Sequence, residues 1–339
     1  MFAVRRAFIG LVAGAASVAL IACNSADVVG PAPSRDYGAM FDDLWKQFDL
    51  HYSYFPLKPV NWDSLGTHYR PLAMAATSDD AFGAVLGKMV SELHDLHVAV
   101  TTDNRVYRYR SPYELADSMM NEAVIFTKYV KSPFETSGGH MRAGVIAPGV
   151  GYVRIRSFQG EDWAAEMDDA LSRLGNVAAV IVDVRDNSGG SKIVATKVAG
   201  RFADRERVFG YVRLRNGPRR DDFSDDILET VKPEGTRHHG GRVYVLSNRG
   251  CMSAAEDFIL AMRSLPTATI VGDTTVGASG GPLVRELANG WTYQMSQWVA
   301  YTADHNIFEG IGLAPDIVVK HGPNAASDLQ LERAIALAK

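Results

Sequence analysis

The sequence has little cysteine and no strong excess of charge of either sign. Two cysteines among 339 residues cannot form a disulfide framework. The 35 lysines and arginines against 39 acidic residues leave a formal net charge of -4, which provides no general attraction to nucleic acid. With 47% hydrophobic and 22% charged residues, the chain is not collagen-like or wholly disordered. Its length corresponds to about two domains.

The N-terminus differs from this average composition. Arg5 and Arg6 precede an apolar run over residues 7–22, which is shorter than the roughly 20 residues that span a bilayer as a helix. A basic start, a short apolar centre and small residues before Cys23 are typical of a secretory signal. Leu-Ile-Ala-Cys at 20–23 resembles the bacterial lipobox, which implies cleavage before Cys23 and acylation of this residue. A plain secretory signal with a coincidental cysteine is the alternative.

This N-terminus predicts an exported, membrane-anchored lipoprotein, facing the periplasm or the cell surface of a bacterium. Residues 1–22 are the expected lipoprotein signal peptide. Residues 23–35, which contain Gly30, Pro31 and Pro33, are the expected flexible tether. With Cys23 acylated, Cys251 has no partner for a disulfide.

Residues 36–105 are expected to form a small helical domain. One apolar face follows helical spacing at Phe41, Leu44, Trp45 and Phe48. A cluster of N-capping residues at 77–80 precedes a second periodic segment. Its apolar positions are Phe82, Val85, Leu86, Met89 and Val90.

Residues 106–144 form an expected connecting segment, with a few strands and a helix near 112–120. From 145 to 339 the pattern changes to strands alternating with helices, which predicts a layered α/β core with right-handed crossovers. The expected strands are 152–158, 178–184, 243–246 and 269–271. The expected helices are 161–174, 193–202 and 254–265.

Ser253 follows a buried strand and a glycine turn, and it stands at the start of a helix. Free backbone N–H groups and the positive end of the helix dipole lie at such a position. A serine nucleophile needs a base and donors that hold an oxyanion. Ser253 is equally well explained as an N-cap, with Glu256 completing a capping box.

A second segment has the same context, because Gly189 and Gly190 follow the buried strand 178–184 and open another helix. Paired glycines allow a substrate to approach the backbone closely and expose N–H donors. A tight strand–helix turn is the structural alternative, and a phosphate loop is disfavoured because no Gly-Lys-Ser/Thr follows.

Four segments, in this order, resemble the core of the C-terminal-processing and tricorn-core serine peptidase family: IVDVRDNSGG, SNRGCMSAAEDF, IVGDTTVGASGG and FEGIGLAPDIVV. The resemblance extends over residues 145–320 and implies a crotonase-like α/β core. The preceding segment, which ends in SELHDLHVAV, resembles the helical domain of the tricorn-like branch. The stretch between residues 100 and 145 is too short for the PDZ module that tail-specific relatives carry, so none is expected.

The resemblance also selects between two catalytic schemes. Ala278 stands where the tail-specific branch has its catalytic lysine, so a Ser–Lys dyad is not supported. The tricorn-like branch implies Ser253 as nucleophile, His97 as general base and Glu309 as supporting carboxylate. Leu96 replaces the serine that usually precedes the histidine in that branch.

The expected activity is therefore that of a serine-type peptidase acting on a protein or peptide substrate, with no cofactor. The expected oxyanion donors are the backbone N–H groups of Gly189 or Gly190 and of Ala254. His94 and His97 lack the i, i+4 spacing and intervening glutamate of a zinc helix, so no metal is expected.

Two other functions are compatible with such a core. One is a non-catalytic module that binds apolar ligands or peptides, as in the interphotoreceptor retinoid-binding proteins, which resemble this core. The other is an esterase or an acyl-CoA enzyme. A carrier would not need Ser253, His97 and Glu309 together.

Overall fold

The computed structural model describes residues 36–111, 120–320 and 326–339. The expected signal peptide, the tether, Cys23 and, apart from Met120, the helix near 112–120 lie outside these residues. The chain divides into residues 1–34 and 35–339, and the description below concerns the second unit. No helix in the described ranges is long and apolar enough to cross a membrane.

The N-terminal segment forms three helices, as the apolar periodicity predicts: α1 (Tyr37–His51), α2 (Trp62–Met74) and α3 (Asp79–Ser91). Each begins with a side-chain cap on a backbone N–H that has no partner within the helix, from Asp36, Asn61 and Ser78 respectively. The apolar face of α1 is buried.

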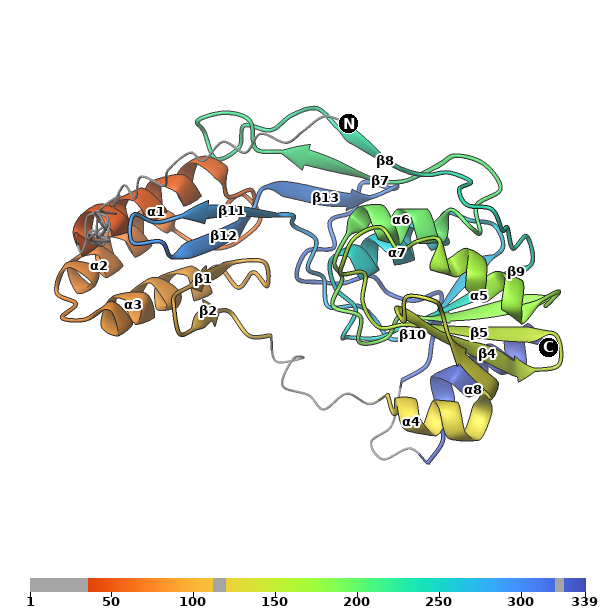
Figure 1. Ribbon diagram of the computed structural model, residues 1–339. Helices are drawn as coiled ribbons and strands as arrows, with labels where there is room; N and C mark the ends of the chain where they lie inside the picture. The colour runs from red at the N-terminus through yellow and green to blue at the C-terminus, as the bar shows by residue number, and fades with distance from the viewer. Residues whose placement is uncertain (1–35, 112–119, 321–325) are drawn as a thin grey trace, which may run out of the picture. The chain divides into compact units, whose positions relative to one another are not determined.

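These helices pack on a four-stranded sheet in the order β11-β12-β1-β2 (Figure 1). Its strands are β1 (Ala99–Thr101), β2 (Val106–Arg108), β11 (Pro282–Glu286) and β12 (Thr292–Ser296). Val100 pairs with Tyr293, so a hairpin from late in the chain completes the helical region. Both residues belong to the hydrophobic cluster that contains Phe48 and Phe82 of the helices.

The α/β core is a seven-stranded sheet in the order β14-β10-β9-β6-β5-β4-β3. The run from β5 to β14 is parallel, whereas β3 and β4 are antiparallel additions. The strands are β3 (Lys131–Glu135), β4 (Met141–Ala147), β5 (Val150–Ile155), β6 (Ala179–Asp183), β9 (Arg242–Ser247), β10 (Ala268–Gly272) and β14 (Ile317–Val318).

Helices cover both faces of this sheet (Figure 1). Val182 and Val245 face the cluster formed with α5 (Glu166–Leu174), α6 (Lys192–Ala199) and α7 (Ala254–Arg263). Ile181 and Leu246 face the opposite cluster, which contains the π-helical turn η1 (Ile125–Tyr129) and α8 (Leu329–Ala338). A short α4 (Glu122–Val124) precedes η1. Burial on both faces explains the nearly continuous apolar strands in the sequence.

A third sheet has the order β13-β7-β8. Its strands are β7 (Arg207–Leu214), β8 (Ile227–Val231) and β13 (Trp298–Thr302). All three are absent from the strands that the sequence predicts.

Two predicted helix boundaries are wrong. The helix expected to end at residue 202 ends at Ala199. The helix expected from residue 161 begins at Glu166. Trp163 holds the preceding residues in a turn, because its indole N–H donates to the carbonyl of Gln159 (2.8 Å) and its ring stacks on Phe158.

The parallel strands end along one edge of the sheet. Asp183 of β6 pairs with Leu246 of β9, and Ser247 pairs with Gly272 of β10. The loops that follow these three strands therefore leave the sheet side by side. Ligands in open α/β sheets bind at this edge, and the paired glycines and Ser253 lie on two of these loops.

Candidate active site

Ser253 occupies a strained turn between β9 and α7. Its backbone has φ 55° and ψ -127°, a combination that non-glycine residues rarely adopt. A serine on a sharp strand-to-helix turn is the arrangement in which hydrolases expose a nucleophilic hydroxyl. Ser253 is partly exposed, whereas Ala254 and Ala255 behind it are buried. Strain at such a position indicates function better than an ordinary N-cap would.

Glu256 joins this turn to the loop after β10. Its buried carboxylate accepts hydrogen bonds from the backbone N–H groups of Ser253 (3.2 Å), Gly277 (2.8 Å) and Ala278 (2.9 Å), and from the Thr275 hydroxyl. Burial raises the pKa of the Glu256 carboxyl to about 7, and these donors oppose the increase. The capping role expected for Glu256 is thus present, and it also positions the loop beside Ser253.

Gly189 lies directly against the serine turn. A Cβ atom on Gly189 would be 2.8 Å from the Cβ of Ser253 and 2.9 Å from the backbone nitrogen of Ala254. The N–H of Gly189 donates to the side-chain oxygen of Asn187 (2.8 Å). Among the described residues, no hydrogen-bond acceptor is found for the N–H groups of Gly190 and Ala254. Of the two glycines that the sequence singled out, Gly190 is thus the one whose N–H has no acceptor among these residues.

Two asparagines that sequence reasoning missed hold these loops together. Asn248 donates to the Asp186 carboxylate (2.7 Å) and accepts from the Asp186 N–H (2.8 Å). The carbonyl of Asn187 accepts from the N–H of Met252 (3.1 Å). Both lie in the quoted motifs, DNSGG and SNRG, but only their pairing across the sheet edge reveals their role.

Glu309 approaches the serine turn through Ser279. One carboxylate oxygen of Glu309 accepts from the N–H (2.8 Å) and the hydroxyl (3.0 Å) of Ser279. The residue before it, Ala278, accepts the N–H of Ser253 at its carbonyl (3.0 Å). Ala278, which stands where the tail-specific branch has its lysine, is thus beside Ser253 and has only a methyl side chain.

The other carboxylate oxygen of Glu309 pairs with Lys58 (3.3 Å). The Lys58 ammonium also donates to the carbonyl of His94 (3.0 Å), and the Tyr54 hydroxyl lies 2.8 Å from that of Ser279. Burial raises the pKa of Glu309 to about 7; the charge of Asp95 contributes to this increase, and Lys58 opposes it. No sequence motif indicates Tyr54, Lys58 or Ser279 as parts of the site.

His97 lies in the loop between α3 and β1. The Asp95 carboxylate accepts the N–H of His97 (2.8 Å), and Gln294 donates to the His97 carbonyl (3.0 Å). In the described part of the chain, the imidazole makes no hydrogen bond to Ser253 or Glu309, and its Nδ1 is buried without a partner. Burial lowers the pKa of His97 below the ordinary imidazole value, whereas Asp95 opposes the decrease.

Cys251 is a packed thiol beside the serine turn. It is fully buried, and its Sγ donates to the carbonyl of Val184 (3.0 Å). Burial raises the pKa of the Cys251 thiol to about 12, so almost no thiolate forms near neutral pH. The thiol therefore contributes to packing.

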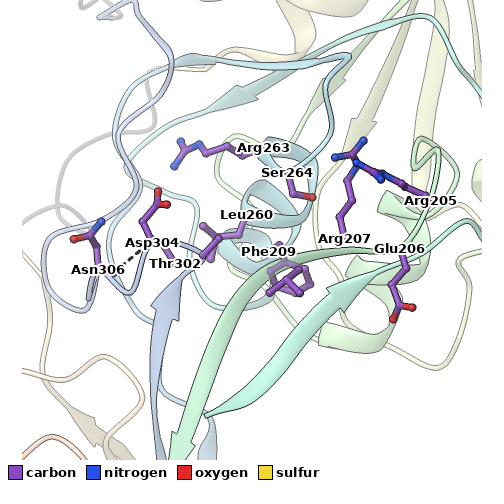
Figure 2. Close-up of a pocket in the computed structure, with 12 residues that line it drawn as sticks. Arg205, Glu206, Arg207, Phe209, Leu260, Arg263, Ser264, Thr302, Asp304 and Asn306 are labelled. Carbon is purple, nitrogen blue, oxygen red and sulfur yellow. Dashed lines mark hydrogen bonds between the residues drawn. The ribbon is translucent and has the colours of Figure 1, made fainter.

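A cavity of about 560 Å³ lies at the other end of α7 and includes none of the predicted site residues (Figure 2). Arg205, Arg207 and Arg263 line it together with Glu206 and Asp304. Two of these arginines are paired with carboxylates, because Asp204 binds Arg207 and Asp316 lies 3.7 Å from Arg263. This cavity is therefore separate from the candidate active site around Ser253.

Comparisons with known proteins agree with this architecture. The model of peptidase family S41 matches residues 149–319, half of the chain, and the tricorn protease C1 domain matches residues 33–91. A protein of Staphylococcus haemolyticus described as a CtpA-like serine protease is 29% identical over 169 residues, which are 49% of this chain and 32% of the relative. The match thus spans about a third of that relative's length.

Two solved structures resemble the whole described fold. A candidate peptidase from Parabacteroides merdae has a TM-score of 0.78 at 29% identity, covering 91% of this chain and 97% of the other. Mature CPAF has a TM-score of 0.65 at 13% identity, covering 90% and 95%, which indicates a shared fold. The predicted α/β core with an N-terminal helical region is confirmed, and no PDZ domain is indicated in the ranges that the structure describes. The chain belongs to peptidase family S41.

Proposed function

We propose that this chain is a serine endopeptidase that hydrolyses peptide bonds through an acyl-enzyme on Ser253. His97 is the general base and Glu309 the supporting carboxylate. The observation that carries the proposal is the strained turn of Ser253, which is followed by the N–H of Ala254, unpaired among the described residues, and packed against Gly189, the residue before Gly190. A serine hydroxyl next to unpaired N–H groups is suited to attack a carbonyl and to hold the resulting oxyanion.

The chemical steps follow from these groups. The Ser253 oxygen attacks the peptide carbonyl carbon while His97 takes the hydroxyl proton. The carbonyl oxygen becomes an oxyanion, which accepts from the N–H groups of Ala254 and Gly190. When the intermediate collapses, the C–N bond breaks and His97 returns the proton to the leaving amine. Water, deprotonated by His97, then cleaves the ester and restores Ser253.

His97 has the protonation state that this role needs. Because burial lowers its pKa, the imidazole is neutral at pH 7 and can accept a proton. The Nδ1 atom of His97 has no hydrogen-bond partner among the described residues, so it can make an orienting contact in the substrate complex. Catalytic hydrogen bonds often form only when substrate closes a site, so we expect His97 to approach Ser253 on substrate binding.

A fluorophosphonate probe tests the proposal, because it labels activated serines covalently. We expect labelling of the parent protein and its loss in Ser253→Ala and His97→Ala. Ser264 at the opposite end of α7 and the exposed His68 provide matched controls, and Ser264→Ala and His68→Ala should label like the parent. Undiminished labelling of Ser253→Ala would refute the nucleophile. A folded parent that neither labels nor cleaves peptides would support the ligand-binding alternative.

The substrate class and the cellular site belong to the same proposal. Relatives described as proteases support a protein or peptide substrate. The lipobox-like residues 20–23 support export and acylation of Cys23, which would anchor the enzyme to a bacterial membrane. Incorporation of a fatty-acid analogue should disappear in Cys23→Ala and persist in Cys251→Ala, which removes only the buried thiol. Incorporation that persists in Cys23→Ala would exclude the anchor.

A further inference from the structure

Among the hydrogen bonds and ion pairs of the described residues, none joins Glu309 to Ser253 or to His97, although Glu309 is the expected supporting carboxylate. Its hydrogen-bonding partners are Ser279 on one oxygen and Lys58 on the other. The Glu309 side chain is only 4% exposed. The positioning influence of this carboxylate on the reaction therefore passes through the groups that hold it.

Ser279 is the first of these groups. Its hydroxyl donates to Glu309 and, because a hydroxyl has a single proton, it can only accept from the Tyr54 hydroxyl at 2.8 Å. Burial raises the pKa of Tyr54 well above its ordinary value, so Tyr54 keeps the proton that it donates. The hydrogen-bond chain thus has one direction, from Tyr54 to Ser279 to Glu309.

Ser279 is also linked to the candidate nucleophile, through a hydrogen bond of the neighbouring residue. Its neighbour Ala278 accepts the Ser253 N–H, and the Ser279 carbonyl accepts the indole N–H of Trp298 (3.1 Å). The segment that touches Ser253 is therefore held by Glu309 through two donors of Ser279, one from the backbone and one from the side chain. Losing the hydroxyl would leave one of them.

Lys58 is the second group. Its ammonium contacts both Glu309 and the carbonyl of His94, three residues before His97. Lys58 lies between α1 and α2, so it connects the helical region, the histidine loop and the carboxylate. Within the described residues, the other ionisable groups that influence Glu309 electrostatically are Asp95, Tyr52 and Tyr54. The charge of Lys58 lowers the pKa of Glu309 and so opposes the increase that the charge of Asp95 causes.

We propose that Ser279 and Lys58 are positioning residues through which Glu309 acts on the Ser253 turn and on the His97 loop. This inference rests on the proposed function of the same site. Ser279 transmits the orientation of Glu309 to the nucleophile segment, and Lys58 favours the ionised form of Glu309 and links it to the histidine loop. The tricorn-like branch usually has a serine before the histidine, and Leu96 stands at that position here. Ser279 provides a hydroxyl near the Glu309 carboxylate from another part of the chain.

The pH dependence of fluorophosphonate labelling tests the proposal. Removing either donor destabilises the Glu309 carboxylate, so Ser279→Ala and Lys58→Met should shift the acid limb of the labelling profile to higher pH. The labelling rate at pH 7 should fall by about tenfold, as expected for losing a hydrogen bond to a charged group. Ser279→Thr and Lys58→Arg keep the donors and should recover the parent profile. A purely structural role would lower the rate equally at every pH.

Two results distinguish this inference from the proposed function. If Ser253 is labelled in the parent but Ser279→Ala and Lys58→Met keep its profile, the inference is wrong and the proposed function stands. If the parent is not labelled, titration of the Glu309 carboxyl by ¹³C NMR decides independently. Its pKa should rise in Lys58→Met and return in Lys58→Arg, and an unchanged titration would overturn the role of Lys58.

Discussion

Replacing Gly189 with alanine should disable the serine turn and destabilise the fold. Gly189 has φ 90°, a left-handed conformation that costs an L-residue roughly 1–2 kcal/mol. The new Cβ would lie 2.8 Å from the Met252 carbonyl oxygen, 2.8 Å from the Ser253 Cβ and 2.9 Å from the Ala254 nitrogen. Ordinary contacts between such atoms are about 3.5–4.0 Å, so the serine turn must move.

The magnitude follows from this displacement. Overpacking of this kind costs about 1–3 kcal/mol, in addition to the conformational term. The total expected loss is therefore about 2–5 kcal/mol in the free energy of unfolding. A displacement of about 1 Å in reacting groups lowers rates by about 10²-fold, and Ser253 and the Ala254 N–H move together here. We expect a similar decrease in the rate of fluorophosphonate labelling.

Gly290 provides the matched control. It has φ 86°, but a Cβ there would have no atom within 4 Å. Gly290→Ala should therefore cost only the conformational 1–2 kcal/mol and label at the parent rate. Urea unfolding and labelling time courses on both variants measure the two effects. If Gly189→Ala labels at the parent rate and unfolds like Gly290→Ala, the assigned packing of the serine turn is incorrect.

Three further predictions follow from buried groups. The raised pKa of Glu256 means that the folded protein binds more protons than the unfolded chain between pH 4.5 and about 7. The parent protein should therefore lose about 3 kcal/mol of stability as the pH rises through that range. Urea unfolding at pH 5 and at pH 8 measures this loss, which should be smaller in Glu256→Gln. Arg185 is fully buried on Asp183 and Asp328, so Arg185→Met should destabilise by about 3–5 kcal/mol in the same measurement, and a neutral result would contradict this. Iodoacetamide should modify Cys251 only after denaturation, as mass spectrometry would detect.

Much of the α/β core could be predicted because its signals are local. Strands such as β6 are buried on both faces and therefore read as continuous apolar runs, and helices such as α1 bury one periodic face. β7, β8, β11, β12, β13 and β14 were not predicted, and neither was β1, which lies in the segment expected to be helical. β11 is mostly exposed, so its sequence does not need a strong apolar pattern.

The candidate site divides in the same way. Ser253 and the glycines at 189 and 190 have local signals, since each follows a buried strand and opens a helix. The assignments of His97 and Glu309 depended on the family resemblance. Tyr54, Lys58 and Ser279 have no motif around them, and their importance comes only from contacts made over 225 and 251 residues of sequence separation.

The sequence by itself determined the α/β core, the membership of a serine peptidase family and the position of the candidate nucleophile. These depend on periodicity and on short motifs that each fold locally. Only the tertiary structure decided which partners surround Glu309, that Gly189 packs against the Ser253 turn, and that a late hairpin completes the helical region. The physical reason is that hydrogen bonds and strand pairing between distant segments leave no periodic trace in the sequence.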